Sequence, residues 1–183
     1  DKIRFMKGRP EKIGGWVKLD TDTIASGTVR ALLPYRANNS NRYIGIGTHS
    51  HLYLYDDGAG TYTDITPASN YTAGAQHTTI SSGTYTYATM WTLDRFGEDL
   101  IGVNGIGGRL VRLDTSAFQS NSSTNAVTET TSGVPSSANG VIVNSASRQV
   151  VLYGAHDGTD SSPMNVAFSD LGDITDFTPT VSN

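Results

Sequence analysis

Short runs of β-branched and aromatic residues, separated by Gly, Asn and Asp, recur along this chain. Two such runs surround the polar His49-Ser50 turn between residues 42 and 58, and two more surround glycine-rich turns between residues 99 and 114. A third pair occupies residues 148–154 and 164–170, on either side of a polar loop. Apolar runs of this length bounded by turn residues predict antiparallel hairpins.

The three hairpins repeat at a nearly constant spacing. Ile44-Gly45 and Ile101-Gly102 lie 57 residues apart, and the closing Asp56, Asp114 and Asp170 are separated by 58 and 56 residues. A further strand is expected before each hairpin, at residues 28–33, 88–93 and 140–144. Four short strands per unit are typical of a β-propeller blade, and propellers have about four to eight blades. The pattern predicts an all-β, propeller-like fold with about three blades of a larger, incomplete propeller.

We expect one continuous β-repeat segment over residues 1–183, and its abrupt ends suggest a piece of a longer polypeptide. Two stretches rich in Thr, Ser, Ala, Asn and Gly, residues 61–85 and 115–137, are expected to be surface loops or extensions. The expected divisions are a leading segment (1–27), repeat 1 with its loop (28–87), repeat 2 with its Ser/Thr/Asn loop (88–139) and repeat 3 (140–183).

Composition narrows the function classes. The chain has 20 Gly and 9 Tyr, which favours strands and turns. A net charge of -4 with 16% charged residues and no Lys/Arg run gives no basic patch for free nucleic acid. The absence of cysteine removes disulfides, thiolate catalysis and Cys-ligated zinc. The sequence has neither an apolar run of membrane-spanning length nor a signal peptide, so we expect no membrane insertion.

Candidate metal sites have a simpler alternative in each case. His49 and His51 would share a face on a strand, but exposed turn histidines explain them without a metal. The clusters at residues 56–60 and 157–160 offer carboxylates, but Asp-Gly pairs more commonly form turns and neither cluster has the spacing of an EF-hand loop. The glycines of residues 102–107 lie in a hairpin with no following helix, which indicates a turn. We therefore expect no metal and no cofactor.

The common nucleophile-elbow, phosphate-loop and zinc-protease signatures are absent, and no pair of the scattered carboxylates stands out as a glycosidase pair. The segment Ser169–Phe177 resembles the Asp-box turn of sialidase-like propellers, which is structural in that family too. We expect a protein that is not an enzyme. Trp16 and Trp91 could be sugar-binding platforms, although an aromatic residue in a strand is more commonly part of the core.

A more specific interpretation comes from residues 3–16, Ile-Arg-Phe-Met-Lys-Gly-Arg-Pro-Glu-Lys-Ile-Gly-Gly-Trp. This stretch resembles the segment that precedes the first propeller blade in tail nozzle proteins of short-tailed phages (podoviruses), also called tail tubular protein B or stabilisation proteins. Residues 91–100 and 166–177 are similar to the beginnings of that family's second and third blades. The matching positions, which we expect to be structural, are Gly8, Pro10, Glu11, Lys12, Gly14, Gly15, Trp16, Trp91 and Phe177.

The resemblance implies a structural virion protein of the tail, made in the host cytoplasm and arranged as a ring around the DNA exit channel. Its implied partners are an adaptor protein, tail fibres and further nozzle copies, with transient contact to exiting DNA. Family members are several times longer than this chain. Two other functions stay open: a carbohydrate-binding propeller module in host recognition, and a sialidase-like glycoside hydrolase.

Overall fold

The computed structural model describes residues 3–12, 26–105, 107–156, 159 and 162–178. Strands make up 45% of the described residues and helix 4%, and the strands form several antiparallel sheets. The all-β class expected from the sequence is confirmed. Among the described residues, no helix is long and apolar enough to span a membrane.

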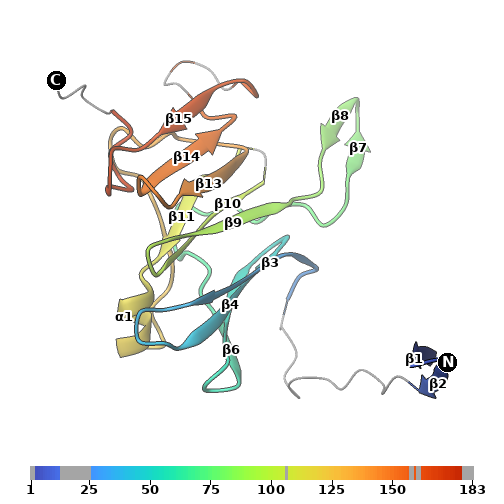
Figure 1. The fold of residues 1–183 in the computed structure, drawn as a ribbon. Coiled ribbons are helices and arrows are strands. Elements are labelled where there is room, and N and C mark those ends of the chain that lie inside the picture. The colour runs from blue at the N-terminus through green and yellow to red at the C-terminus, as the bar shows by residue number, and fades with distance from the viewer. Residues whose placement is uncertain (1–2, 13–25, 106, 157–158, 160–161, 179–183) are drawn as a thin grey trace.

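Three antiparallel sheets form the body of the molecule (Figure 1). In each sheet, strands that are consecutive in sequence pair with one another. The first sheet contains β3 (Val29–Arg36), β4 (Arg42–Thr48), β5 (Leu52–Asp56) and β6 (Thr61–Asp64). The second contains β9 (Trp91–Phe96), β10 (Asp99–Asn104), β11 (Leu110–Leu113) and β12 (Val127–Thr128), and the third contains β13 (Gly140–Asn144), β14 (Gln149–Tyr153) and β15 (Val166–Phe168).

Two separate hairpins and one helix complete the described structure. Strands β1 (Ile3–Met6) and β2 (Arg9–Lys12) pair with each other, as do β7 (Thr79–Ser81) and β8 (Thr84–Thr86). Helix α1 (Thr115–Ser120) follows β11 and begins after Asp114, whose carboxylate accepts a hydrogen bond from the Ala117 N–H. An aspartate at this position satisfies a backbone donor that the helix itself leaves unpaired.

The first and second sheets pack face to face through one core cluster. Alternation along β5 sends Leu52 and Leu54 into this core, while Tyr53 and Tyr55 pack on the opposite face of the same sheet. Only glycine fits at Gly45 on β4, because a Cβ there would lie 2.9 Å from the Leu100 side chain of the second sheet. Small residues therefore set how closely the two sheets approach.

The second and third sheets pack in the same way. Ile101 and Val103 of β10 point away from the first sheet and belong to one core cluster with Val150 and Leu152 of β14. Figure 1 shows the first strands of the sheets, β3, β9 and β13, following one another across the body, and β9 contacts both of the others. The three sheets thus form a stack with the second sheet in the middle.

Two expectations about loops were wrong in part. Residues 61–85 contain β6, β7 and most of β8, and Ile65 within this stretch is fully buried. Residues 115–137 contain α1 and β12, and Phe118 of the helix packs edge-on against Tyr43 of the first sheet. A few apolar residues in these polar stretches anchor them to the core, a tertiary effect that local composition does not show.

Candidate functional site

The first half of the family-like motif forms the β1–β2 hairpin. Gly8 lies in its turn with a φ of 78°, a conformation that favours glycine, and both Gly8 and Pro10 are exposed. Glu11 and Lys12 lie in β2, where they pair with Arg4 and Ile3 of β1. The rest of the motif, Gly14, Gly15 and Trp16, lies outside the described residues.

Trp91 joins the first two sheets. It is buried at the start of β9, and its Nε1 donates a hydrogen bond to the carbonyl oxygen of Thr48 at 2.6 Å. The Tyr71 ring stacks on it at 6.2 Å, and the missing side chain of Gly47 leaves room for the indole. The ring is part of the core, so Trp91 offers no free face to a sugar.

The segment resembling an Asp box is a hydrogen-bonded turn against the third sheet. Ser169 is fully buried, and its hydroxyl accepts from the Val150 N–H at 2.9 Å and donates to the Asp170 carbonyl at 3.0 Å. The Asp173 carboxylate accepts from both the N–H and the hydroxyl of Thr175, which holds the pKa of Asp173 below its usual range. Phe177 packs against the core between the second and third sheets.

The histidine and aspartate candidates make turn contacts. His49 Nδ1 accepts from the Thr28 N–H at 3.0 Å, while His51 Nδ1 and the Ser50 hydroxyl lie 2.8 Å apart. Asp56 accepts from the N–H groups of the turn that follows it. The part of the chain that the structure describes contains no group of three or more His, Asp or Glu side chains placed to hold a metal. Asp157, Gly158 and Asp160 lie outside that part.

A buried polar network, not predicted from the sequence, connects the second sheet to the first. The Asp99 carboxylate accepts from Nε and Nη2 of Arg112, both at 2.8 Å, and from the Thr115 N–H at 3.2 Å. The Thr115 hydroxyl lies 3.2 Å from that of Tyr35 on β3. Burial raises the pKa of Asp99 despite these donors, and burial also raises the pKa of Tyr35. Because Asp99 forms an ion pair with Arg112, we assign it a structural role in joining the second sheet to the first.

Glu129 is a second buried carboxylate near Arg112. Only 8% of the residue is exposed, and burial raises the pKa of Glu129 although the positive charge of Arg112 opposes this rise. A buried carboxylate without strong donors favours its protonated form. Glu129 is therefore a source of pH-dependent stability.

The edge of the third sheet is held by side chains of the second. Thr92 on β9 accepts from the Val141 N–H at 3.0 Å, and the Asp94 carboxylate accepts from the Val143 N–H at 2.7 Å. These side chains satisfy donors on β13, the first strand of its sheet and therefore an edge strand. Two residues spaced by two on β9 thus fix the position of the neighbouring strand.

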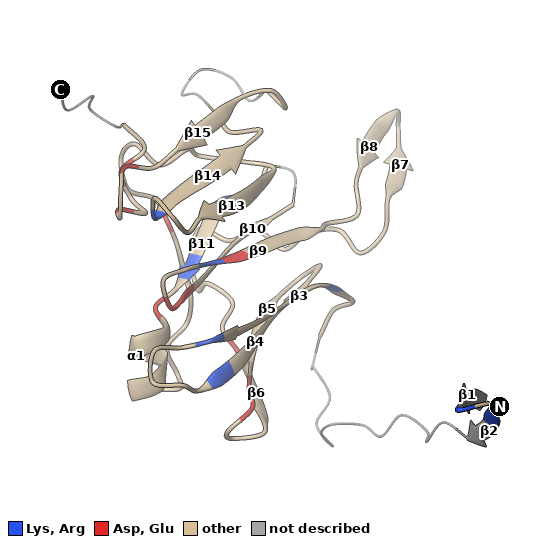
Figure 2. Cartoon of the chain, viewed as in Figure 1, with Lys and Arg blue, Asp and Glu red and all other residues tan. Residues whose placement is uncertain are grey.

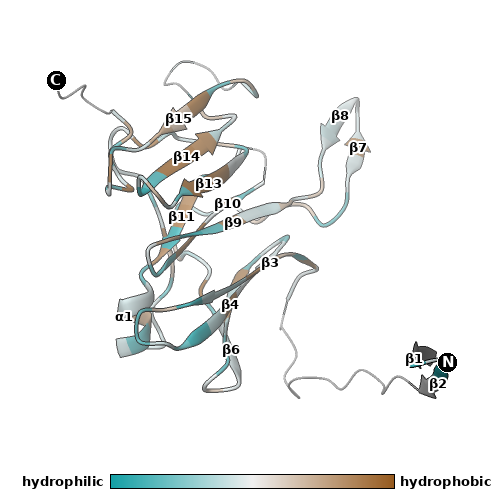
Figure 3. Cartoon of the chain, in the orientation of Figure 1, coloured by the Kyte–Doolittle hydropathy of each residue, from teal (hydrophilic) through white to brown (hydrophobic). Residues whose placement is uncertain are grey.

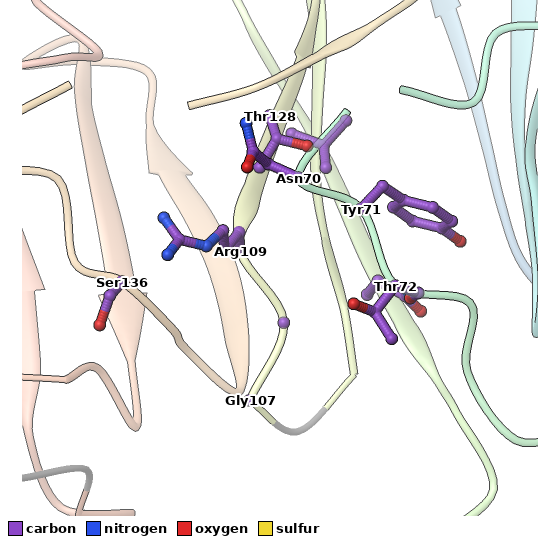
Figure 4. Close-up of a pocket in the computed structure, with 10 residues that line it drawn as sticks. Asn70, Tyr71, Thr72, Gly107, Arg109, Thr128 and Ser136 are labelled. Atoms are coloured by element: carbon purple, nitrogen blue, oxygen red, sulfur yellow. The ribbon is translucent and has the colours of Figure 1, made fainter. Parts of the chain in front are cut away.

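A small polar pocket lies between the second sheet, Ser136 and residues 70–72 (Figure 4). Its volume is about 120 Å³, below the ~300 Å³ at which small-molecule sites usually begin. Arg109 points toward Ser136 on one side, while the Tyr71 ring points away on the other. Burial raises the pKa of Tyr71, with the Asp64 charge adding to the effect. The pocket suits ordered water better than a metabolite.

Comparisons with protein-family models, curated proteins and solved structures found no match for this chain. The residues described above mainly join one sheet to the next. Sequence inspection missed Asp94, Asp99 and Glu129 because an acidic residue in a strand has no distinctive local pattern, and their partners lie far away in the chain. Trp91 was detectable because tryptophan is rare and lies within a predicted strand.

Proposed function

We propose that this chain is a structural segment of the tail nozzle of a short-tailed phage, contributing about three blades of a larger β-propeller. The observation that carries the proposal is the stack of three antiparallel sheets with β3, β9 and β13 side by side. Propellers place the first strands of successive four-stranded sheets around a central channel. The third sheet has three strands among the described residues, and the proposal has a fourth strand completing this blade.

The outward face of the third sheet supports a continuing propeller. Ile142, Val151 and Phe168 form one row across β13, β14 and β15, on the face opposite the core. Ile142 is 56% exposed and Phe168 is 50% exposed. Figure 3 shows the apolar character of these strands. A further blade packing here would bury this face as the second sheet buries the inner one.

The phage assignment rests on the sequence motifs. Gly8, Pro10, Glu11, Lys12 and the glycines and tryptophan of residues 14–16 resemble the family's segment before the first blade. In this proposal the chain belongs to a ring of nozzle copies in the virion tail, docks an adaptor and tail fibres through its loops, and contacts DNA only in passing. The net charge of -4 is suited to a channel that releases DNA.

The role is structural and not catalytic. Asp99 is paired with Arg112, Ser169 is engaged in its turn, and Trp91 is packed between sheets. These groups stabilise the repeat, and the proposal assigns no cofactor to them. Rigid sheets with polar connecting loops are suited to presenting contact surfaces to neighbouring proteins.

Immunogold labelling of native phage particles tests the assignment. Antibodies raised against this chain are expected to label the distal tail of intact particles, close to the channel axis. Label confined to the capsid, to side fibres or to material not attached to particles would overturn the nozzle role. Particles treated with antibodies pre-absorbed with the purified chain provide the matched control.

A further inference from the structure

The β7–β8 hairpin projects from the body as an arm without charge. Residues 76–90 contain no Asp, Glu, Lys or Arg, and Figure 2 shows the arm free of both charge colours. Its larger side chains stay accessible: Tyr85 is 58% exposed and Tyr87 is 61% exposed. A two-stranded hairpin is only marginally stable alone. The two exposed tyrosine rings do not anchor this hairpin to the core.

A cleft of about 580 Å³ lies where the arm meets the second and third sheets. This volume is within the usual range of ligand sites. Tyr85, Tyr87 and Met90 line it from the arm, and Asn139 and Tyr153 line it from the third sheet and the segment before it. Among the described residues, no Asp, Glu, Lys, Arg or His lines the cleft. In contrast, the pocket of Figure 4 contains Arg109.

The two arm tyrosines form one aromatic surface. Tyr85 and Tyr87 are two residues apart, so their side chains leave the same face of the hairpin. Their rings lie 6.2 Å apart at an interplanar angle of 22°. More than half of each side chain is accessible, so the rings present apolar faces while their hydroxyls stay free to hydrogen-bond.

The opposite wall supplies polar groups. Tyr153 packs over Gly140, where any Cβ would overlap its hydroxyl. Asn139 uses its backbone N–H to pair with the Tyr153 carbonyl at 2.9 Å, and its side-chain amide has no hydrogen-bond partner among the described residues. A side-chain amide offers two donors and an acceptor, and Asn139 lines the cleft together with Tyr153. The cleft thus combines aromatic faces with neutral hydrogen-bonding groups.

We propose that this cleft binds a neutral oligosaccharide, with a pyranose ring stacked on Tyr85 and Tyr87 and its hydroxyls bonded to Asn139 and Tyr153. The C–H face of a sugar matches an aromatic surface, and its hydroxyls match amide and phenol groups. An anionic or cationic ligand would lose its water without gaining an ionic partner, because none of the described lining residues is charged.

Isothermal titration calorimetry of the purified chain tests the site with maltoheptaose, cellohexaose, mannohexaose and xylohexaose as probes. Saturable binding of at least one probe is expected. Tyr85→Ala and Tyr87→Ala should each weaken it by about tenfold, the effect of losing ~1.4 kcal/mol of stacking. Tyr85→Phe and Tyr87→Phe keep the rings and should retain most of the affinity. Leu171→Ala changes an exposed apolar residue outside the cleft and should have no effect.

Circular dichroism spectra that match the wild type establish that each variant is folded. The proposal is overturned if none of the four probes binds at millimolar concentration. It is also overturned if a probe binds equally well to both alanine variants. If the alanine substitutions abolish self-association while no probe binds, the arm is a protein-docking surface and the sugar site is wrong.

Discussion

Asp94 and Val143 link the second sheet to the third: the Asp94 carboxylate accepts a hydrogen bond from the Val143 N–H at 2.7 Å. The two residues are 49 positions apart and belong to the first strands of adjacent sheets. The Val141 N–H donates in the same way to the Thr92 hydroxyl. Together the two bonds satisfy backbone donors on the edge strand β13 that would otherwise have no partner. Side chains on β9 therefore accept hydrogen bonds from the edge of β13, as the backbone of a paired strand would.

Asp94→Ala is predicted to loosen this edge. Hydrogen bonds to charged groups contribute about 1.5–3 kcal/mol, so the free energy of unfolding should fall by about that amount. Amide hydrogen exchange at Val143 should accelerate more than at Ile101, which lies in the core of the second sheet. Asp94→Asn keeps an acceptor oxygen and should cost less. Equal exchange at Val143 in the alanine variant and the wild type would show that the contact is unimportant.

Trp91→Phe tests how the first two sheets are joined. The change removes the Nε1–H donor to the Thr48 carbonyl and part of the ring that stacks with Tyr71. Loss of a large buried side chain to Ala costs about 3–5 kcal/mol, and Phe should cost somewhat less. Chemical denaturation measures the difference. Leu171→Ala, at an exposed site, should stay within about 0.5 kcal/mol of the wild type.

Glu129 gives a pH-dependence with a definite sign. Because burial raises the pKa of Glu129 above its ordinary value of 4.5, the folded state binds the proton more tightly than the unfolded state. This residue's contribution to stability is therefore present at low pH and is lost as pH rises through the raised pKa. The advantage of Glu129→Gln over the wild type should grow as the pH rises above 4.5.

Denaturation curves at several pH values measure this difference in the free energy of unfolding. Asp173→Asn is the opposite control. Because the pKa of Asp173 is lowered in the folded state, its carboxylate stabilises the fold at pH values above its ordinary pKa of 3.8. This stabilisation is lost as the pH falls, so Asp173→Asn should differ least from the wild type at acid pH. A Glu129→Gln advantage that is constant across the range would contradict the assignment.

Phe168 reports on whether the outward face of the third sheet is covered in the assembled protein. The side chain is half exposed in this chain, and it shares a row with Ile142 and Val151. Hydroxyl-radical footprinting should modify Phe168 in the isolated chain and leave it protected in the native particle. Leu171, which is also exposed, provides the comparison site. Equal modification of Phe168 in both samples would argue against a further blade.

Local pattern was sufficient for the strands around residues 42–56 and 99–113, because β-branched runs and Asp-Gly or Asn-Gly turns mark them directly. It was insufficient for α1, since a six-residue helix in a Ser/Thr-rich stretch depends on the Asp114 cap and on burial of Phe118. It also missed Tyr85, the last residue of a stretch expected to be a loop, and Tyr87 just after it. Contacts across 40 or more residues, such as Trp91 with Thr48, required the structure.

The central claim is that the three sheets are blades of a nozzle propeller. Cryo-electron microscopy of the native particle that contains this chain tests it most directly. The account predicts a symmetric ring of copies around the tail channel, with β3, β9 and β13 nearest the centre of each propeller and further blades covering Phe168. A free, closed monomer outside any particle, with no blade against the third sheet, would contradict it.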